Sequence, residues 1–426
     1  MSENAVSNNK PEKIVLETQE PPRDKGYAWV VLVCSTINAV FARGSFTAFG
    51  VFQTYYLKVM FANERAENVA WIATCTVSMI LGGGIFASKI VRRLGIRKTN
   101  LLASFIALTG MVGASFCTEI WQLALTQGVI FGFGSSIIVN VYMSTLTMWF
   151  DKHRSVAISI SSSGSVLGGI ILIPLVNKLI AVASIQWAFR VYGMMFFVCT
   201  GICGILMKPR IPYKPLDKIV DFKLLKDPVA LPLSLGGFFM EIGVYTMILY
   251  FPSSMIDNTG TSRELATSLF MIYNLSSVVG RLVSGFLSKR FDPSLIVAIG
   301  HITSAALMMG MWFGTKSFAV YVSFMVIFGI IAAPYFALSP VIAASNFNIE
   351  TVAHVNGLAY LFNGAALFSS IPTIGVVYQK LGHRSSYQQI IAIAAASYVV
   401  STGCMVYILY ASKKRKSKAD NNEVQF

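Results

Sequence analysis

The sequence predicts an all-α integral membrane protein with twelve transmembrane helices in two bundles of six. Composition is the first observation: 55% of the 426 residues are hydrophobic and only 12% are charged, whereas soluble proteins carry about a quarter charged residues. The apolar segments also form one size class of about 20 residues, the length of a membrane-spanning helix, and lack the ten-residue alternation of a barrel. A single long polar break at 208–228 then divides them six and six.

Each predicted span is bounded by short polar breaks. The spans of the first bundle (28–207) are 28–52, 68–90, 99–117, 120–148, 154–180 and 187–207, and those of the second bundle (229–411) are 229–256, 264–288, 294–313, 317–344, 352–379 and 387–411. We expect 1–27 to be a disordered cytosolic N-terminus, 208–228 a cytosolic linker with a short surface helix at 217–226, and 412–426 a basic cytosolic tail.

The distribution of Lys and Arg predicts the orientation of the chain. With both termini in the cytosol, 24 of the 34 Lys and Arg residues fall on the cytosolic side and 8 on the outer side. This asymmetry is the positive-inside pattern, so the net charge of +15 is explained by the lipid bilayer and not by nucleic acid. We expect a multi-pass membrane protein with both termini in the cytosol.

Several function classes are excluded by what the sequence lacks. The six cysteines lie in or at the ends of apolar spans and have no metal-ligand spacing with a histidine, so we expect neither a metal nor a cofactor. No nucleotide-binding motif and no nucleophile–base spacing stands out, so we expect no enzyme and no ATP drive.

Two charged residues, Glu241 and Arg281, lie deep within separate spans. A charge at the bilayer centre costs about 2.5–3.5 kcal/mol or more, so such residues are paired or line a water-filled path. We take Glu241 as the candidate proton-coupling carboxylate and Arg281 as the anchor for an anionic substrate. The alternatives are a static salt bridge between them, or a Glu241 bonded to backbone. Arg43 lies nearer the outer end of its span, where a long side chain can snorkel.

Polar and aromatic residues within the spans complete a candidate substrate cavity. They are Asn38, Asn140, Tyr142, Tyr245, Asn274, Tyr335, Asn356, Tyr360 and Asn363. Aromatic faces with amides suit a flat ligand as well as a small acid. The alternative for each residue is an interhelical hydrogen bond.

A cationic turn recurs at corresponding places in the two halves. The second span ends at Arg92 and Arg93, and the eighth ends at Lys289 and Arg290. Two parallel repeats of six helices are the build of major facilitator transporters. The turn resembles the gating motif of that superfamily, which makes Arg93 and Arg290 candidate gating residues, although Arg92 and Lys289 stand where the motif has an acidic residue.

Two further segments resemble the signatures of the monocarboxylate porter family within that superfamily. The residues that carry the resemblance are Asp24, Gly26 and Trp29 ahead of the first span, and Lys152 and Arg154 ahead of the fifth. Lys25 replaces a family glycine, and residues 50–55 resemble the fungal branch. Small residues at 159–169 follow the second signature and make the fifth span slim, either for close packing or as a serine-lined path.

The resemblance implies a role for one of the buried charges. In the proton-coupled porters an Arg of the eighth helix binds the substrate carboxylate, and Arg281 falls on that position. The acidic residue expected one turn earlier is Ser277, and the family's first-helix Lys falls on Thr47. The lactate–proton mechanism therefore does not transfer directly. The resemblance also implies the plasma membrane as the location, with a vacuolar or other organelle membrane as the alternative.

We expect a secondary transporter of a carboxylate or related organic metabolite that works by alternating access, with or without proton coupling. A facilitator of a larger planar metabolite such as riboflavin is the first alternative. A non-transporting nutrient sensor on the same fold is the second, against which the short termini argue. The expected partners are a small-molecule substrate, protons and lipid, with the protein either monomeric or bound to an accessory protein.

Overall fold

The computed structural model of the chain describes residues 21–211, 221–382 and 386–423. Within this part every regular element is helical, and eleven helical segments are long and apolar enough to cross a membrane. The predicted all-α membrane fold is therefore confirmed.

The elements of the first half are α1 (Tyr27–Ala42), α2 (Gly44–Tyr55), η1 (Tyr56–Met60), α3 (Ala66–Gly82), η2 (Gly83–Phe86), α4 (Ala87–Ala114), α5 (Ile120–Leu123), η3 (Ala124–Ile130), α6 (Phe131–Trp149), α7 (Arg154–Val182) and α8 (Ile185–Leu206). The elements of the second half are η4 (Phe222–Lys226), α9 (Ala230–Thr259), α10 (Arg263–Leu287), α11 (Pro293–Leu307), η5 (Met308–Trp312), α12 (Phe318–Ala332), α13 (Pro334–Asn346), α14 (Ile349–Lys380) and α15 (Gln388–Glu423).

Gly95 explains why eleven segments make twelve crossings. The segment Asn68–Ala114 has 47 residues, and α4 within it consists of two helices that meet at Gly95, where φ is +76°. A positive φ is readily adopted only by glycine, so the chain turns here without a loop. The second and third predicted spans are these two helices.

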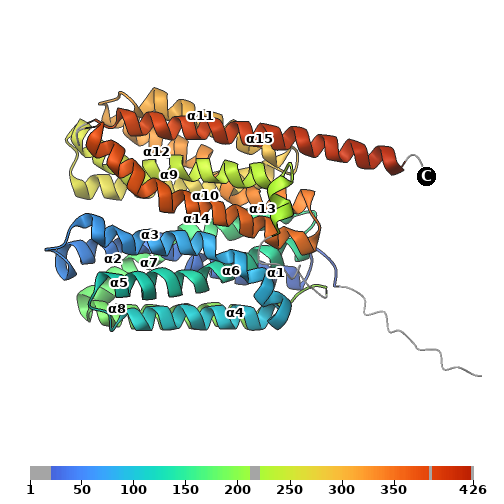
Figure 1. Cartoon of the computed structure of the whole chain (residues 1–426), viewed down its shortest axis with the longest axis horizontal. Helices are drawn as coiled ribbons and strands as arrows, with labels where there is room; N and C mark the ends of the chain where they lie inside the picture. Colours follow the sequence, from blue (N-terminus) through green and yellow to red (C-terminus); the bar gives the residue numbers. More distant parts are fainter. Residues whose placement is uncertain (1–20, 212–220, 383–385, 424–426) are drawn as a thin grey trace, which may run out of the picture.

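The two halves lie side by side with their helices along the long axis of the molecule (Figure 1). In the first half α1 packs on α6, α7 and α8, and in the second half α9 and α11 pack on α15. The halves meet along two seams, α3 against α14 and α7 against α10 and α13. A substrate path between the halves would therefore be bounded by these seams.

Small residues allow the closest helix crossings. A Cβ atom on Gly168 of α7 would lie 2.7 Å from the Cα of Gly44, and one on Gly364 of α14 would lie 2.6 Å from the carbonyl oxygen of Ser78. Neither crossing has room for a side chain. The slimness of the fifth span thus serves packing against the first.

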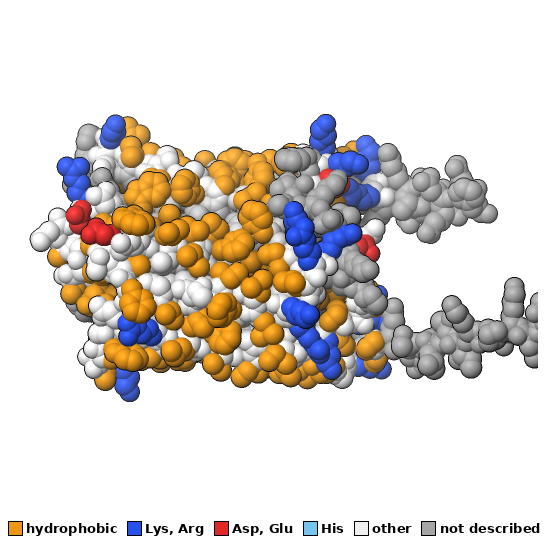
Figure 2. Space-filling model, turned by 60° about the horizontal axis from the view of Figure 1, so that its bottom comes forward, with side chains coloured by type: hydrophobic (Ala, Val, Ile, Leu, Met, Phe, Trp, Pro, Cys, Tyr) orange, Lys and Arg blue, Asp and Glu red, His pale blue; other side chains and the backbone are white. Residues whose placement is uncertain are grey.

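The outer surface has the distribution of a bilayer-spanning protein. Exposed large apolar side chains such as Phe105, Ile202 and Val399 lie along the sides of the helices. Figure 2 shows hydrophobic side chains over the middle of one face, with Lys and Arg gathered toward its two ends. This pattern places the helices across the membrane.

The ends of the chain differ in part from the predictions. Residues 1–20, 212–220 and 424–426 lie outside the described residues, but Asp24 within the segment expected to be disordered is held by hydrogen bonds to the α6–α7 turn. The predicted surface helix at 217–226 lies partly outside the described residues, and its described part contains a 3-10 helix, Phe222–Lys226. Helix α15 continues to Glu423, because the Ala, Lys and Arg of the tail favour helix.

Candidate functional site

Three charged side chains are buried between the halves of the described structure. Arg43, Glu241 and Arg281 are 8%, 2% and 7% exposed. Arg43 lies at the junction of α1 and α2, Glu241 in α9 and Arg281 in α10. One cation thus comes from the first half, and the other two charges come from the second.

Arg281 reaches from the second half into the first. Its Nη1 donates to the carbonyl oxygen of Ser162 at 2.5 Å and to the Oγ of Ser165 at 2.7 Å, both on α7. Its guanidinium also lies 5.1 Å from the ring centre of Phe336 in α13. Its Nε has no hydrogen-bond partner in the described part of the chain.

Glu241 is not in a salt bridge with Arg281. Among the described residues no ion pair and no hydrogen bond involves its carboxyl group, and Oε1 is buried without a partner. Arg43 and then Arg281 are the cations that interact with it electrostatically at longer range. Neither static alternative, a direct salt bridge or a backbone hydrogen bond, is present.

Arg43 does not snorkel to the outer surface. Its guanidinium lies 5.7 Å from the ring centre of Phe336 and 5.4 Å from that of Tyr360, two rings of the second half. No acceptor for its N–H groups occurs within the described residues. The first crossing extends to Met60 instead of ending near residue 52, so Arg43 sits at its middle and not toward its outer end.

Aromatic side chains surround these charges. Tyr142 and Tyr360 interact electrostatically with Arg43, and Tyr245 lies one turn after Glu241 with its ring 5.3 Å from that of Phe46. The hydroxyl groups of Tyr142, Tyr245 and Tyr360 have no partner in the described structure. We call Arg43, Tyr142, Glu241, Tyr245, Arg281 and Tyr360 the central cluster.

Other predicted cavity residues lie beside this cluster or away from it. Tyr335 and Asn363 meet at Gly237, one turn before Glu241, and Tyr335 donates to the carbonyl oxygen of Leu233. Asn356 is buried on α14 with an unpartnered amide in the described part. Asn38 contacts the sulfur of Met207 at 3.3 Å, and Asn274 donates to Phe270 of its own helix.

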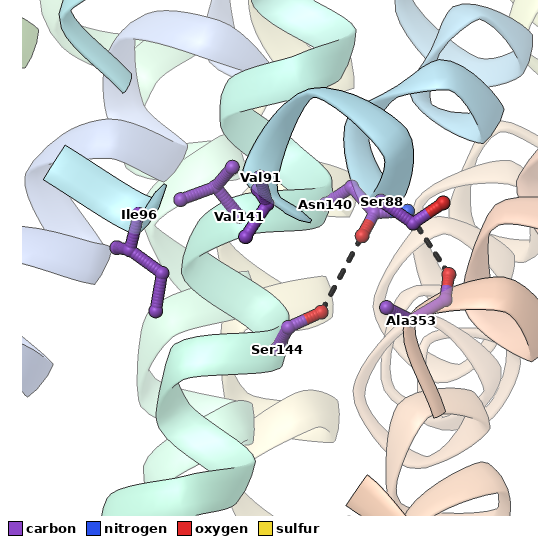
Figure 3. Close-up of a pocket in the computed structure, with 7 residues that line it drawn as sticks. All are labelled: Ser88, Val91, Ile96, Asn140, Val141, Ser144 and Ala353. Atoms are coloured by element: carbon purple, nitrogen blue, oxygen red, sulfur yellow. Dashed lines mark hydrogen bonds between the residues drawn. The ribbon is translucent and has the colours of Figure 1, made fainter. Parts of the chain in front are cut away.

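Toward the end of the molecule where α1 begins, the halves are joined directly. Asn140 of α6 donates to the carbonyl oxygens of Gly84 at 3.2 Å and of Ala353 in α14 at 3.3 Å. Figure 3 shows this side chain bonded to Ala353 beside a cavity of about 10 Å³, which holds at most one water molecule. Arg154 likewise donates to the carbonyl oxygen of Ala344 at 3.3 Å. These hydrogen bonds of Asn140 and Arg154 hold the two halves together at this end.

The residues of the two signature segments lie around the turn between α6 and α7. Asp24 accepts hydrogen bonds from the backbone N–H groups of 151, 152 and 153, so Lys152 contributes through its backbone. Burial alone raises the pKa of Asp24, but the three donors outweigh burial and hold that pKa below its usual value. Gly26 precedes α1 with φ +55°, and Trp29 lies half exposed against Phe150. Arg93 and Arg290 are exposed at the cationic turns.

Sequence reasoning missed the partners of the two arginines. Phe336, Ser162 and Ser165 carry no charge, and nothing in a single sequence shows which helices face each other across the halves. Arg43 carried a usable signal, since it is a cation inside a span. No group of three possible metal ligands occurs among the described residues.

The known proteins to which this chain is similar are transporters. The chain matches the Major Facilitator Superfamily over residues 31–366 and again over 233–425. It is 26% identical to the MFS transporter asaE of Aspergillus flavus, covering 92% of this chain and 91% of that protein, and 27% identical to the agnestins efflux protein AgnL12 of Paecilomyces divaricatus, covering 98% and 92%. The E. coli fucose:proton symporter FucP superposes with a TM-score of 0.70 at 11% identity, covering 91% of this chain and 99% of that one.

Proposed function

Because the chain belongs to the Major Facilitator Superfamily, we propose that this secondary transporter carries an organic monoanion with an aromatic or conjugated body. The single observation that carries the proposal is the charge of the central cluster. Arg43 and Arg281 supply two positive charges, and an ionised Glu241 supplies one negative charge. A buried charge without a partner is strongly unfavourable, so a ligand with one carboxylate would complete the balance.

The chemistry of the cluster supports a carboxylate. Guanidinium groups present several N–H donors and bind carboxylates in forked pairs. Arg281 has an unpartnered Nε in the described part of the chain, and the guanidinium of Arg43 lies over two aromatic rings. The rings of Phe46, Phe336 and Tyr360 supply flat apolar walls for the body of the ligand.

Glu241 supplies a route to proton coupling. A proton on this carboxyl removes the only negative charge of the cluster and so strengthens the binding of an anion. We therefore propose that proton and anion travel in the same direction. The names of relatives that are efflux proteins support export of the metabolite down its own gradient.

We also propose a location, an orientation and an oligomeric state for the protein. We place the protein in the plasma membrane with both termini in the cytosol, with bundles at 28–207 and 229–411, as a monomer or with an accessory protein. The closer relationship to monocarboxylate porters also belongs to the proposal. Transport of a planar metabolite such as riboflavin is the second candidate, which the aromatic walls favour.

Purified protein in proteoliposomes tests the function. Uptake is measured for a labelled panel of aromatic and aliphatic monocarboxylates and riboflavin, with and without a pH gradient. We expect an aromatic monocarboxylate to be transported faster when the pH gradient drives protons the same way. Glu241→Gln should abolish this pH dependence while anion exchange continues. A pH dependence unchanged in Glu241→Gln contradicts the role of Glu241, and transport of riboflavin alone favours the second candidate.

A further inference from the structure

Arg281 donates hydrogen bonds to the protein through the same guanidinium group that, in the proposed function, binds the substrate. Its Nη1 donates to the Ser162 carbonyl oxygen and to the Ser165 hydroxyl. The Ser165 hydroxyl itself donates to the Ser162 carbonyl at 2.7 Å, so its lone pairs point toward the guanidinium. α7 thus offers Arg281 two oxygen acceptors in the place where a carboxylate would offer two.

These bonds cross from one half of the transporter to the other. Arg281 and Phe336 belong to the second half, whereas Ser162 and Ser165 belong to the first. Along the same seam, the hydroxyl of Ser155, two turns before Ser162 on α7, donates to the carbonyl oxygen of Gly285, one turn after Arg281 on α10. Alternating access requires the halves to separate along this seam, and the Arg281 bonds must then break.

Arg43 makes the reciprocal contact. It extends from the first half onto Phe336 and Tyr360 of the second. Both guanidinium groups share the ring of Phe336, so a ligand that draws Arg281 away from α7 also changes the surroundings of Arg43. Each half therefore holds the other through one arginine.

We propose that Ser165, with the Ser162 carbonyl, is the stand-in ligand of Arg281 in the empty transporter, and that the substrate carboxylate displaces it. Ser165 is then a positioning residue with two effects. It competes with substrate for Arg281, and it keeps the seam between α7 and α10 closed while the site is empty. This inference rests on the proposed function only for the identity of the displacing group.

The first test follows the seam without any substrate. Spin labels on the exposed positions Lys152 and Lys289, in a background whose six cysteines are replaced, report the distance between the cytosolic ends of α7 and α10. We expect Ser165→Ala to add a population at longer distance in the empty protein. Ser163→Ala is the matched control, because the Ser163 hydroxyl bonds only to the carbonyl of Ser159 in its own helix.

The second test uses transport in proteoliposomes with the carboxylate found by the substrate panel. Loss of a hydrogen bond to a charged group changes an equilibrium by about tenfold. We therefore expect Ser165→Ala to lower KM by about tenfold and to lower the ratio of exchange to net flux, because the empty carrier then reorients more easily. Ser165→Thr, which keeps the hydroxyl, should restore the values of the wild type.

The outcomes separate this inference from the proposed function. If Ser165→Ala behaves like Ser163→Ala in both tests, the inference is overturned. A defect that Ser165→Thr does not restore assigns Ser165 to packing and also overturns it. If the wild type transports no organic anion but Ser165→Ala still opens the seam, the proposed function fails while the closing role of Ser165 stands.

Discussion

The buried position of Arg43 shows that the buried charges are more than a single ion pair. Glu241 and Arg281 alone suggest one ion pair. The structure instead shows two buried cations and one buried acid, with no salt bridge between them. The in-span position of all three was readable from the sequence. The separation of Glu241 from Arg281, and the sharing of Phe336 by both arginines, depended on helix contacts that no local pattern specifies.

Replacing Arg43 should move the pH optimum of transport. Arg43→Gln leaves one cation against Glu241, so the cluster with an ionised carboxylate has no net charge for an anion. Protonation of Glu241 restores one net positive charge, so the variant should transport poorly where Glu241 is ionised and recover as the pH falls. Arg43→Lys keeps the charge and should keep the pH profile while raising KM, because an ammonium lacks the planar fork. If Arg43→Gln keeps the wild-type pH profile, the charge of Arg43 does not contribute to substrate binding.

At the scale of elements, hydropathy predicts where the membrane spans lie but not how consecutive helices are joined. The prediction placed separate helices at 68–90 and 99–117, and the structure joins them through Gly95. The first crossing is longer than predicted because the end of α2 and the π-helical segment Tyr56–Met60 continue the helix past residue 52. Hydropathy records burial in lipid, whereas these joints are fixed by backbone conformation and by contacts with other helices.

The crossing of α3 and α14 offers a test of helix packing. A Cβ on Gly364 would lie 2.6 Å from the Ser78 carbonyl oxygen and 2.8 Å from the Gly82 nitrogen. Overpacking of this kind costs about 1–3 kcal/mol, so Gly364→Ala should lower the thermal midpoint measured in detergent. Gly403→Ala is the control, since a Cβ on Gly403 meets nothing within 4 Å. Equal midpoints for the two variants would show that the helices shift freely at this crossing.

At the scale of the whole molecule, hydrogen bonds join the two halves at the end where α1 begins. Asn140, Arg154 and Ser155 each bridge the two halves on that side by a hydrogen bond to a backbone carbonyl. The sequence predicts two bundles and a path between them. It does not predict which end is closed, because the same residues must serve both conformations.

Asn140→Ala should weaken this closure. The variant loses the hydrogen bond to Ala353, so labels at Lys152 and Lys289 should report a larger population with separated cytosolic ends. Ser135→Ala on the same helix is the control, because the described structure gives the Ser135 hydroxyl no partner. Identical distance distributions in both variants would assign Asn140 to the interior of its own bundle.

The charge of the central cluster also decides which compounds would block the carrier. A molecule with two carboxylates would leave the cluster one negative charge in excess as long as Glu241 is ionised. Such a compound should bind only when Glu241 is protonated, and it would then hold both guanidinium groups at once. A rigid aromatic dicarboxylate is therefore the natural starting point for an inhibitor whose potency rises as the pH falls.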